Sequence, residues 1–491
     1  MSNRQQKPRE LVRQLGMIAA ISCGVGSIIG SGIFKKPALM ATQLGSPEML
    51  VLVWVIAGVL TLFGTLSIAE ISGMFMDAGG QYVYFNKSYN DFIGYLYGWA
   101  VLAVIQTGSI ASIAYVFSDS LGYFFRFPRL GPAWESFAIH LPYIGDITPF
   151  KFIGLKLSTI FLLVFLTIVN YLGVRLGSAV QVFFTSLKVL TIVAIVILAF
   201  TLGHGNVANF SANAPAVSAD IPFFLAFIMA MAGAFWAYDG WINVTYMAGE
   251  IKNVQKNLPK SMAIAVLIVI AVYILVNLAY IYIIPVNVMA QKYAIAEQTG
   301  QSYLVATDAA NNFLGSWGGA LIAIAIMIST FGAVNGTTMM SARVYFAMAR
   351  EGLFFKKIGE IHPRFLTPGP SLILQCIWAS VLVLSGTFDQ LTDMLIFVSW
   401  IFYALGALGV IVLRKKMPDH PRPYRVWGYP WVPWIFIVFA AIYVVFTLYS
   451  DMSNFIHHRT PLINSLMGLL LVAIGIPGYL YWKRKKKRFT S

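Results

Sequence analysis

The sequence predicts an all-α integral membrane protein with twelve transmembrane helices. Three observations lead to this class: an apolar composition, twelve hydrophobic segments of membrane-spanning length, and interruptions near the middle of the first and sixth segments. Of the 491 residues, 58% are hydrophobic and only 11% are charged, whereas soluble domains are nearer half apolar and a quarter charged. The 24 Tyr and 12 Trp suit a chain that needs aromatic side chains at both membrane interfaces.

Hydrophobic windows of about 19 residues define the spans. They cover residues 17–40, 49–75, 91–124, 152–172, 179–203, 221–248, 261–285, 313–349, 370–386, 391–414, 430–450 and 462–482. A count of eleven or thirteen remains open, because a very short loop separates the ninth span from the tenth. Of the longest stretches between spans, 125–151 and 286–312, we expect the second to hold a short amphipathic helix that acts as a lid.

The charge distribution predicts the orientation. With a cytoplasmic N-terminus, 24 of the 34 Lys and Arg lie on inner segments, eight on outer segments and two within spans. Short cytoplasmic loops carry an excess of basic residues, so we expect both termini in the cytoplasm and the tail "KRKKKR" at the inner leaflet of the lipid bilayer. The net charge of +15 does not indicate nucleic-acid binding, since no basic stripe carries stacking aromatics.

Several other classes of protein are disfavoured. Cys23 and Cys376 both lie in apolar spans, so we expect no disulfide framework. The polar start "MSNRQQKPRE" leads into a long span with no small-residue cleavage site, and we expect no cleavable signal peptide. No span contains His, and the HExxH, GxSxG and Walker patterns are missing from the sequence, which argues against an enzyme, a metal site and a bound cofactor.

The first and sixth spans contain helix-weakening residues at their centres. Span one has "GSG" at residues 30–32, and each Gly costs a helix about 1 kcal/mol relative to Ala. Span six carries Asp239 and Gly240, and an Asp at mid-membrane implies a cavity, a partner or a break. Breaks five spans apart are typical of an inverted five-helix repeat with a site at the midplane. For span one alone, close helix packing through Gly26 and Gly30 is the alternative.

The two breaks would expose backbone groups that suit a zwitterion. Unwinding at residues 30–32 leaves free N–H groups at the start of the second half-helix, where an anion binds favourably. Carbonyl groups near Ile28, and those around Trp236 and Asp239, would accept hydrogen bonds from an ammonium group. An anion site beside a cation site matches the α-carboxylate and α-amine of an amino acid.

Seven stretches of the sequence stand out as motifs: "GVGSIIGSGIF", "AEISGMFMDAGGQYVYF", "YLYGW", "FWAYDGW", "GEIKNVQKNLPKS", "FGAVNGTTMMSARVYFAMAREG" and "PRPYRVWGYP". With these motifs the chain resembles the amino acid–polyamine–organocation superfamily and, within it, the L-type amino acid transporter family. Together the motifs cover roughly residues 15–445. The resemblance implies a five-plus-five inverted repeat with discontinuous helices one and six, followed by two C-terminal helices. It also implies secondary active transport of neutral L-amino acids by alternating access, without a cofactor.

This resemblance divides the chain into four parts. Residues 1–16 would be a cytoplasmic tail, 17–414 the inverted-repeat core, 415–482 two additional transmembrane helices with the preceding loop, and 483–491 a basic cytoplasmic tail. We expect a multi-pass protein of the cell inner (plasma) membrane with a small-molecule L-amino acid as substrate.

The resemblance further implies roles for residues in both breaks. The backbone N–H groups of Ser31 and Gly32 would hold the substrate carboxylate. The carbonyl groups of Ile28, Trp236 and Asp239 would accept from its amine. The remaining residues of the expected binding segments are Gly30, Ile33, Ala237 and Gly240.

Two tryptophans are expected to shape the site. Trp236, directly before "AYDGW", would cover bound substrate from outside, and Trp400 in span ten would shape the side-chain pocket. For either ring the alternative is an ordinary packing or interfacial aromatic.

Two departures from the family pattern matter. Eukaryotic members join a single-pass partner through a Cys in the loop between spans three and four. Residues 125–151 contain no Cys, so we expect a bacterial member without a disulfide-linked heavy chain. Ile242 stands where many members carry Asn, which makes the pocket more apolar.

Span five carries Lys188 about nine residues inside the membrane, where an ionisable residue indicates a functional site. The resemblance implies that its ammonium replaces a sodium ion and links span one near Gly26 to span eight near Ser329 and Thr330. Sodium-independent transport would follow. A permanently charged Lys188 favours obligatory exchange, whereas one that loses its proton favours proton-coupled symport. A snorkelling lysine is the structural alternative.

Other polar residues carry weaker signals. Gln106 and Ser109 in span three are candidates for the pocket wall. Glu70, at the inner end of span two, is a candidate for a cytoplasmic ion-pair network with Arg343 and Arg350. An amino-acid-binding membrane receptor with the same fold is the alternative from a different functional class, because it would bind the amino acid without counterflow.

Overall fold

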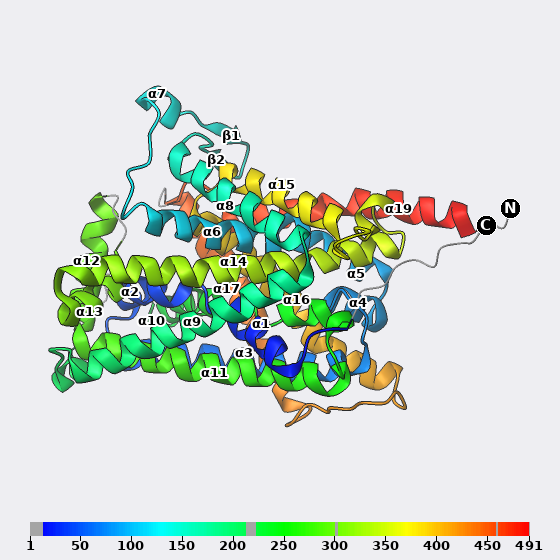
Figure 1. The fold of residues 1–491 in the computed structure, drawn as a ribbon, viewed down its shortest axis with the longest axis horizontal. Coiled ribbons are helices and arrows are strands. Elements are labelled where there is room, and N and C mark those ends of the chain that lie inside the picture. Colours follow the sequence, from blue (N-terminus) through cyan, green and yellow to red (C-terminus); the bar gives the residue numbers. More distant parts are fainter. Residues whose placement is uncertain (1–12, 213–221, 300–302, 458–459, 491) are drawn as a thin grey trace.

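The computed structural model describes residues 13–212, 222–299, 303–457 and 460–490, and its helices run mostly along one common direction (Figure 1). The elements are α1 (Met17–Ile28), α2 (Gly32–Leu44), α3 (Pro47–Met74), α4 (Gln81–Ser88), α5 (Asp91–Ala100), the π-helix η1 (Val101–Ile105), α6 (Gln106–Leu121), α7 (Pro132–Glu135), β1 (Ile139–Leu141), β2 (Gly145–Ile147), α8 (Ile153–Tyr171), α9 (Val174–Thr201), η2 (Val207–Ser211), α10 (Phe223–Tyr238), η3 (Asn243–Glu250), α11 (Val254–Ile283), α12 (Val286–Thr299), α13 (Val305–Leu314), η4 (Gly315–Trp317), α14 (Gly318–Arg350), η5 (Lys356–Gly359), α15 (Gly369–Ser385), α16 (Phe388–Lys416), α17 (Trp431–Ile456), α18 (Asn464–Ala473) and α19 (Gly475–Thr490).

Within the described residues, eleven helical stretches are long and apolar enough to cross a membrane, and α15 is a shorter apolar helix. Together they account for the twelve predicted spans. The ninth and tenth spans, which the sequence left ambiguous, are the separate helices α15 and α16, with only Gly386 and Thr387 between them.

Both predicted helix breaks are present. Helix α1 ends at Ile28 and α2 begins at Gly32, so the first span consists of two half-helices. In the sixth span, α10 ends at Tyr238 and the chain turns into the 3₁₀ helix η3. The turn passes through Gly240 with φ at +96°, a backbone conformation that glycine adopts without steric cost.

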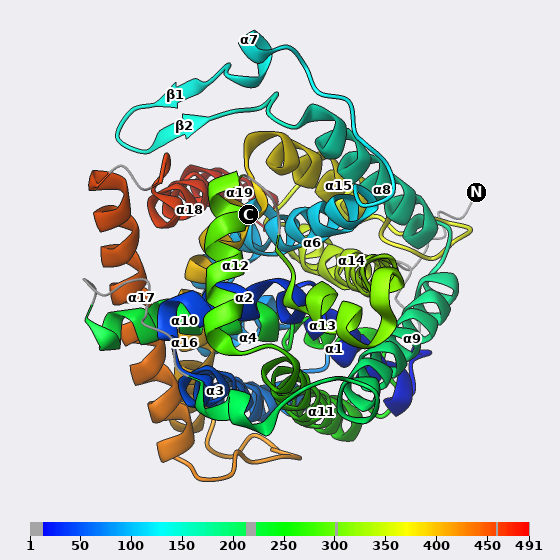
Figure 2. The same ribbon diagram turned by 90° about the vertical axis from the view of Figure 1, so that its left-hand side faces the viewer.

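In the first ten spans, contacts made by one five-helix half are matched by corresponding contacts of the other half. Helix α1 packs against α11, the second helix of the second half, and α10 packs against α3, the second helix of the first half. Likewise α9, the fifth span, packs against α1, and α16, the tenth, packs against α10. Helices α6 and α14, third in each half, contact one another. The view along the bundle shows α1 and α2 inside this ring of helices (Figure 2).

The outer connections contain structure that the sequence did not predict. Between α6 and α8 lie the short helix α7 and the antiparallel hairpin β1–β2, which projects beyond α8 and α15 (Figure 2). The hairpin contacts the segment before α18 through a hydrogen bond in which the Asp146 N–H donates to the Pro461 carbonyl at 3.1 Å. In the region 286–312 we expected one short helix that acts as a lid. The structure has two helices there, α12 and α13, and α12 packs against α2.

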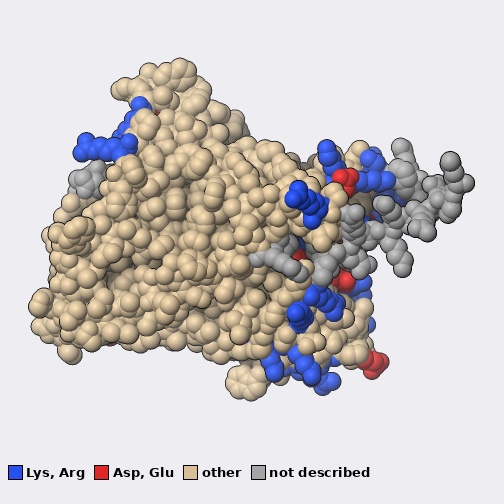
Figure 3. All heavy atoms as spheres, viewed as in Figure 1, with Lys and Arg blue, Asp and Glu red and all other residues tan. Residues whose placement is uncertain are grey.

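Charged residues are distributed unevenly along the bundle. Figure 3 shows Lys and Arg gathered at the end where α19 lies in Figure 1. Most of the opposite part of this face carries neither acidic nor basic side chains (Figure 3). The asymmetry agrees with the excess of basic residues counted on the inner segments.

Candidate functional site

The two helix breaks touch each other at the centre of the bundle. A Cβ atom added to Gly32 would lie 2.5 Å from the Cα atom of Ala237, and one added to Gly240 would lie 2.7 Å from the carbonyl oxygen of Ser27. Such distances are shorter than real Cβ contacts, so only glycine fits at either position without displacing the other break. Glycine therefore allows the two unwound segments to share one site.

The first break presents unpaired backbone donors. Helix α1 closes with the Ile29 N–H donating to Val25 at 2.9 Å, and α2 starts with the Phe34 N–H donating to Ser31 at 3.1 Å. Within the part of the chain that the structure describes, the N–H groups of residues 30–33 have no backbone acceptor. The buried Ser31 Oγ also has no partner there. Four N–H groups and a hydroxyl at a helix N-terminus form an anion-binding arrangement.

Carbonyl groups from both breaks meet beside these donors. The Tyr273 hydroxyl from α11 lies 2.8 Å from the Ala237 carbonyl oxygen and 3.2 Å from that of Ile28. The Trp236 carbonyl accepts from the Asp239 N–H at 3.2 Å. Because a carbonyl oxygen has two lone pairs, the oxygens of Ile28 and Trp236 retain capacity for a second donor.

Lys188 reaches the first break from α9. Its Nζ atom donates to the carbonyl oxygens of Gly26 at 2.8 Å, Ile29 at 2.5 Å and Ser329 at 3.3 Å. The side chain is only 1% exposed, so Lys188 does not snorkel. Three carbonyls satisfy the three N–H donors of an ammonium group. Lys188 thereby joins α9, the end of α1 and the middle of α14.

The hydroxyl of Thr330, which we expected near Lys188, donates elsewhere in the structure. Its hydroxyl donates to the Ile326 carbonyl of its own helix at 2.7 Å, a local bond that Thr readily forms inside helices. The Ser329 hydroxyl instead donates across to the Gly30 carbonyl at 3.3 Å. The structure thus brings Gly26 and Ser329 to Lys188 but leaves Thr330 turned to its own helix.

A small cavity lies between the two breaks. It is lined by Ser27, Ile28, Gly30, Ser31, Gly32, Ser109, Ile113, Trp236 and Asp239. The space open to water-molecule centres is about 10 Å³, which is close to what a single water needs. An amino acid therefore requires at least one wall to move, and the large aromatic ring of Trp236 forms one of these walls.

Further layers cover Trp236 towards the outer end. The rings of Trp236 and Phe388 meet edge to face with centroids 5.8 Å apart. The Lys35 Nζ atom lies 4.8 Å from the centroid of Phe388 and 2.8 Å from a carboxylate oxygen of Asp119. An aromatic pair and an ion pair thus cover Trp236 on this side.

Trp400 does not line this cavity. It is 3% exposed and packs against Phe235, with ring centroids 3.9 Å apart, and against Phe436 and Tyr443 of the adjoining helices. Its contact with the site is therefore indirect, through the α10–α16–α17 interface. Sequence reasoning missed Phe388, the first residue of α16, which lies outside any motif.

Side-chain hydrogen bonds hold the residues around the cavity in place. The Gln106 amide donates to Asn243 Oδ1 at 2.7 Å, and the Asn243 amide donates to Ser27 Oγ at 2.7 Å. On the other side, the Tyr403 hydroxyl from α16 donates to Asp239 Oδ1 at 2.7 Å. Gln106 thus supports the cavity without lining it, and the one carboxylate in the lining already has a partner.

The opposite end of the bundle is closed by a buried ion pair. Arg343 Nε of α14 donates to Glu250 Oε1 at 2.8 Å, and both side chains are at most 3% exposed. The Glu250 carbonyl also accepts from the N–H groups of Gln14 and Leu15, each at 2.9 Å. The start of span one, the end of span six and span eight meet at this point.

Glu70 does not join that network. Its carboxylate pairs instead with Arg414 at 2.7 Å and Arg422 at 3.3 Å. The expected pairing with Arg343 is wrong, because Glu250 occupies Arg343 and the loop after α16 brings Arg422 to Glu70. This separate cluster anchors the loop before α17 to the inner ends of α3 and α16.

Comparisons with known proteins agree with this architecture. A family profile described as "Amino acid permease" matches residues 15–474. The serine/threonine exchanger SteT of Bacillus subtilis (strain 168) is 31% identical, covering 97% of this chain and 98% of that protein. The b(0,+)-type amino acid transporter 1 of Homo sapiens is 32% identical, covering 87% and 81%. The large neutral amino acids transporter small subunit 2 of Mus musculus is 30% identical, covering 98% and 83%.

Proposed function

Because the chain belongs to the amino acid permease family, we propose that it is a secondary active transporter that exchanges neutral L-amino acids by alternating access, independently of sodium. The names of its relatives support this proposal, since they include a serine/threonine exchanger and a transporter of large neutral amino acids. Transport rather than enzymatic chemistry is the activity that these relatives have in common.

The observation that carries the proposal is the meeting of the two helix breaks. In the proposed complex, the N–H groups of Ser31 and Gly32 bind the substrate carboxylate, with those of Gly30 and Ile33 beside them. The ammonium group donates to the carbonyl oxygens of Ile28, Trp236 and Asp239. The remaining segment residues, Ala237 and Gly240, keep the two breaks in contact.

Preference for neutral substrates follows from the charges around the cavity. Asp239 is the single ionisable residue in the cavity lining, and its Oδ1 accepts a hydrogen bond from Tyr403. A cationic side chain would compete with Tyr403 for this carboxylate, and an anionic side chain would be repelled by it. A neutral side chain of small or moderate size avoids both costs.

The proposed sodium independence rests on Lys188. Its ammonium already satisfies the carbonyls of Gly26, Ile29 and Ser329, which are the kind of oxygen ligands that a bound cation would need. A fixed internal cation allows the transporter to cycle with substrate alone, which favours exchange. The alternative, a proton-coupled symporter, requires Lys188 to release its proton during the cycle.

The membrane placement is also part of the proposal. Eleven helical stretches of membrane-spanning length and the shorter apolar α15, all within the described residues, make the chain a multi-pass membrane protein, and we place it in the inner (plasma) membrane. The gathering of Lys and Arg at one end of the bundle (Figure 3) supports cytoplasmic termini by the positive-inside rule. Residues 125–151 offer no Cys, so we propose function without a disulfide-linked heavy chain.

Counterflow in proteoliposomes tests the function. Purified protein is reconstituted, vesicles are loaded with unlabelled serine or leucine or left empty, and uptake of the labelled amino acid is followed without sodium. Uptake into loaded vesicles alone supports exchange. Uptake into empty vesicles that rises with an inward proton gradient supports the symporter instead. Saturable binding of the amino acid without uptake in either case supports the receptor alternative and contradicts transport.

A further inference from the structure

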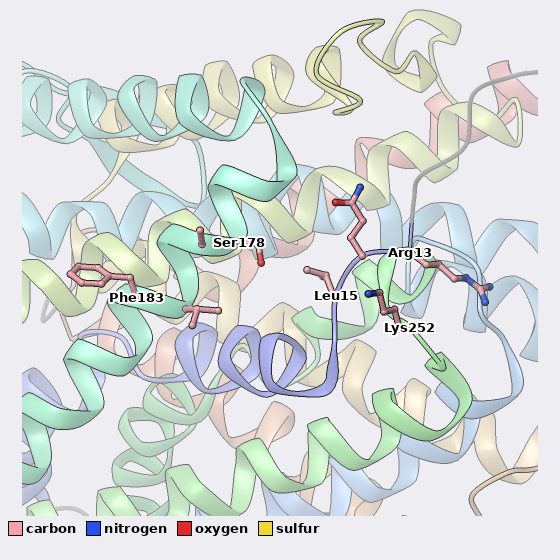
Figure 4. A pocket seen from close by; sticks show the side chains of 8 residues that line it. Arg13, Leu15, Ser178, Phe183 and Lys252 are labelled. Carbon is pink, nitrogen blue, oxygen red and sulfur yellow. The ribbon is translucent and has the colours of Figure 1, made fainter.

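A pocket of a different kind lies away from the two breaks, at the end of the bundle that we place in the cytoplasm. Its volume is about 780 Å³, and it opens between the segment before α1, the start of α9 and the residue Lys252 that follows η3 (Figure 4). The eight lining residues are Arg13, Gln14, Leu15, Ser178, Ala179, Val182, Phe183 and Lys252. The substrate cavity shares none of them.

The pocket has a basic side and an apolar side. Arg13 and Lys252 both have exposed side chains, and no lining residue is acidic. Figure 4 shows the two basic residues on one side and Ser178 and Phe183 of α9 on the other. Two basic side chains at one edge of the pocket and an apolar wall at the other complement a molecule with an anionic head and a hydrophobic tail.

The apolar side continues along the lipid-facing surface of α9. Phe183 is 61% exposed, and Leu176, Leu190 and Ile197 are 49%, 66% and 55% exposed. Because these residues recur every seven positions, they lie on one face of the helix. This stripe runs from the pocket into the membrane span, and its length allows it to contact an acyl chain.

We infer that this pocket binds an anionic phospholipid of the inner leaflet, with the phosphate at Arg13 and Lys252 and an acyl chain along the α9 stripe. Basic residues near the cytoplasmic surface attract anionic lipids by about 1 kcal/mol each. The inference requires the membrane location of the chain but not the proposed transport cycle.

The position of the pocket gives such a lipid a regulatory role. The Lys252 N–H donates to the Leu15 carbonyl at 2.8 Å, and the Leu15 N–H donates to the Glu250 carbonyl at 2.9 Å. These bonds join the start of span one to the end of span six, and Ser178 belongs to span five. A lipid bound to all three segments stabilises the closed inner end, because a ligand shifts the equilibrium towards the state that binds it better.

The experiment measures thermal unfolding of the full-length protein in detergent with added dioleoyl-phosphatidylglycerol or dioleoyl-phosphatidylcholine. We expect phosphatidylglycerol to raise the melting temperature of the wild type by several degrees, and phosphatidylcholine to raise it much less. The double variant R13Q/K252Q should lose most of the phosphatidylglycerol shift. Ala179→Trp, which fills the pocket and keeps both charges, should lose it too.

The control removes two exposed basic residues from another inner loop. K357Q/R364Q makes the same change in net charge and should keep the wild-type shift. An equal loss in this control would overturn the inference, because it would indicate a general charge effect. A full shift in R13Q/K252Q would also overturn the inference, because the lipid would then act at another site. An equal rise with inorganic phosphate alone would show an anion site without lipid specificity.

Discussion

Gly32 of α2 and Ala237 of α10 are in direct backbone contact, so that a Cβ atom on Gly32 would lie 2.5 Å from the Ala237 Cα atom. These residues are more than two hundred positions apart in the sequence, and each lies at the end of a half-helix next to the break of a different span. Their contact makes the two breaks one site. Movement of either half-helix must therefore be transmitted to the other.

Replacing Gly32 by Ala should force the two breaks apart. Overpacking of this kind costs about 1–3 kcal/mol, and the displacement should also abolish most counterflow, because the carboxylate donors move with α2. Thermal unfolding of the purified variant and its counterflow rate measure the two effects. Gly30→Ala is the control for stability, since its Cβ would have no neighbour nearer than 4.0 Å. Equal melting temperatures for the two variants would contradict the steric argument.

Lys188→Met should lose transport and stability together. The substitution leaves the carbonyl oxygens of Gly26, Ile29 and Ser329 without their donor, and each buried group left unsatisfied costs about 1–3 kcal/mol. Counterflow in proteoliposomes and thermal unfolding are the measurements. Lys151→Met, which removes an exposed lysine, serves as the matched control. If Lys188→Met exchanged substrate at the wild-type rate, the proposed internal cation would be ruled out.

The parts of this site that the sequence predicted depend on local signals. Gly30 and Gly32 in the first span, and the pair Asp239–Gly240 in the sixth, disfavour a continuous helix wherever the helix packs, and the structure has a break at each. The sequence also predicted that Lys188 lies deep in the membrane, because the position of a residue within an apolar segment of known length indicates its distance from the membrane surface.

The remaining contacts depend on how distant elements cross. The hydroxyl of Tyr273 reaches both breaks only because α11 packs against α1, and nothing in the sequence around it signals that role. Spacing along the sequence cannot show that the Thr330 hydroxyl donates within its own helix rather than towards Lys188. The hairpin β1–β2 is joined to Pro461, over three hundred residues further along the chain, so its local sequence gave little indication of strands.

Breaking the Glu250–Arg343 pair should be strongly destabilising. Glu250→Gln leaves the guanidinium of Arg343 buried without a counter-charge, and removal of one partner from a buried pair costs about 3–5 kcal/mol. The double variant E250Q/R343M should recover much of the loss, because it removes both charges. Thermal unfolding of the two single variants and the double variant forms the cycle, with the exposed Glu360→Gln as control. A double variant as unstable as the sum of the singles would argue against direct coupling.

The Lys35–Asp119 pair should behave differently because solvent reaches it. The two side chains are 16% and 31% exposed, and exposed pairs contribute at most about 1 kcal/mol. Lys35→Gln should therefore change the apparent affinity for external substrate by less than about five-fold. The difference from wild type should shrink as salt rises from about 0.05 M to about 1 M, because screening weakens the native pair. A large effect that does not depend on salt would assign Lys35 another role.

Tyr273→Phe should weaken the connection between the two half-helices while leaving the fold in place. The hydroxyl lies within hydrogen-bond distance of the Ala237 and Ile28 carbonyls, and one such bond contributes about 0.5–1.5 kcal/mol. The exchange rate should accordingly fall by about 2- to 12-fold, because the carbonyls that we propose for the substrate ammonium lose a common support.

The control for this change is Tyr282→Phe, on the same helix but half-buried near its outer end. Initial counterflow rates at several substrate concentrations separate an effect on substrate binding from an effect on the helix movement. Since Tyr273 supports carbonyls that would contact the ammonium, the KM should rise more for the natural amino acid than for an analogue that lacks the α-amine. Equal losses for both substrates would mean that Tyr273 acts on the helix movement alone, and unchanged kinetics would exclude it from the site.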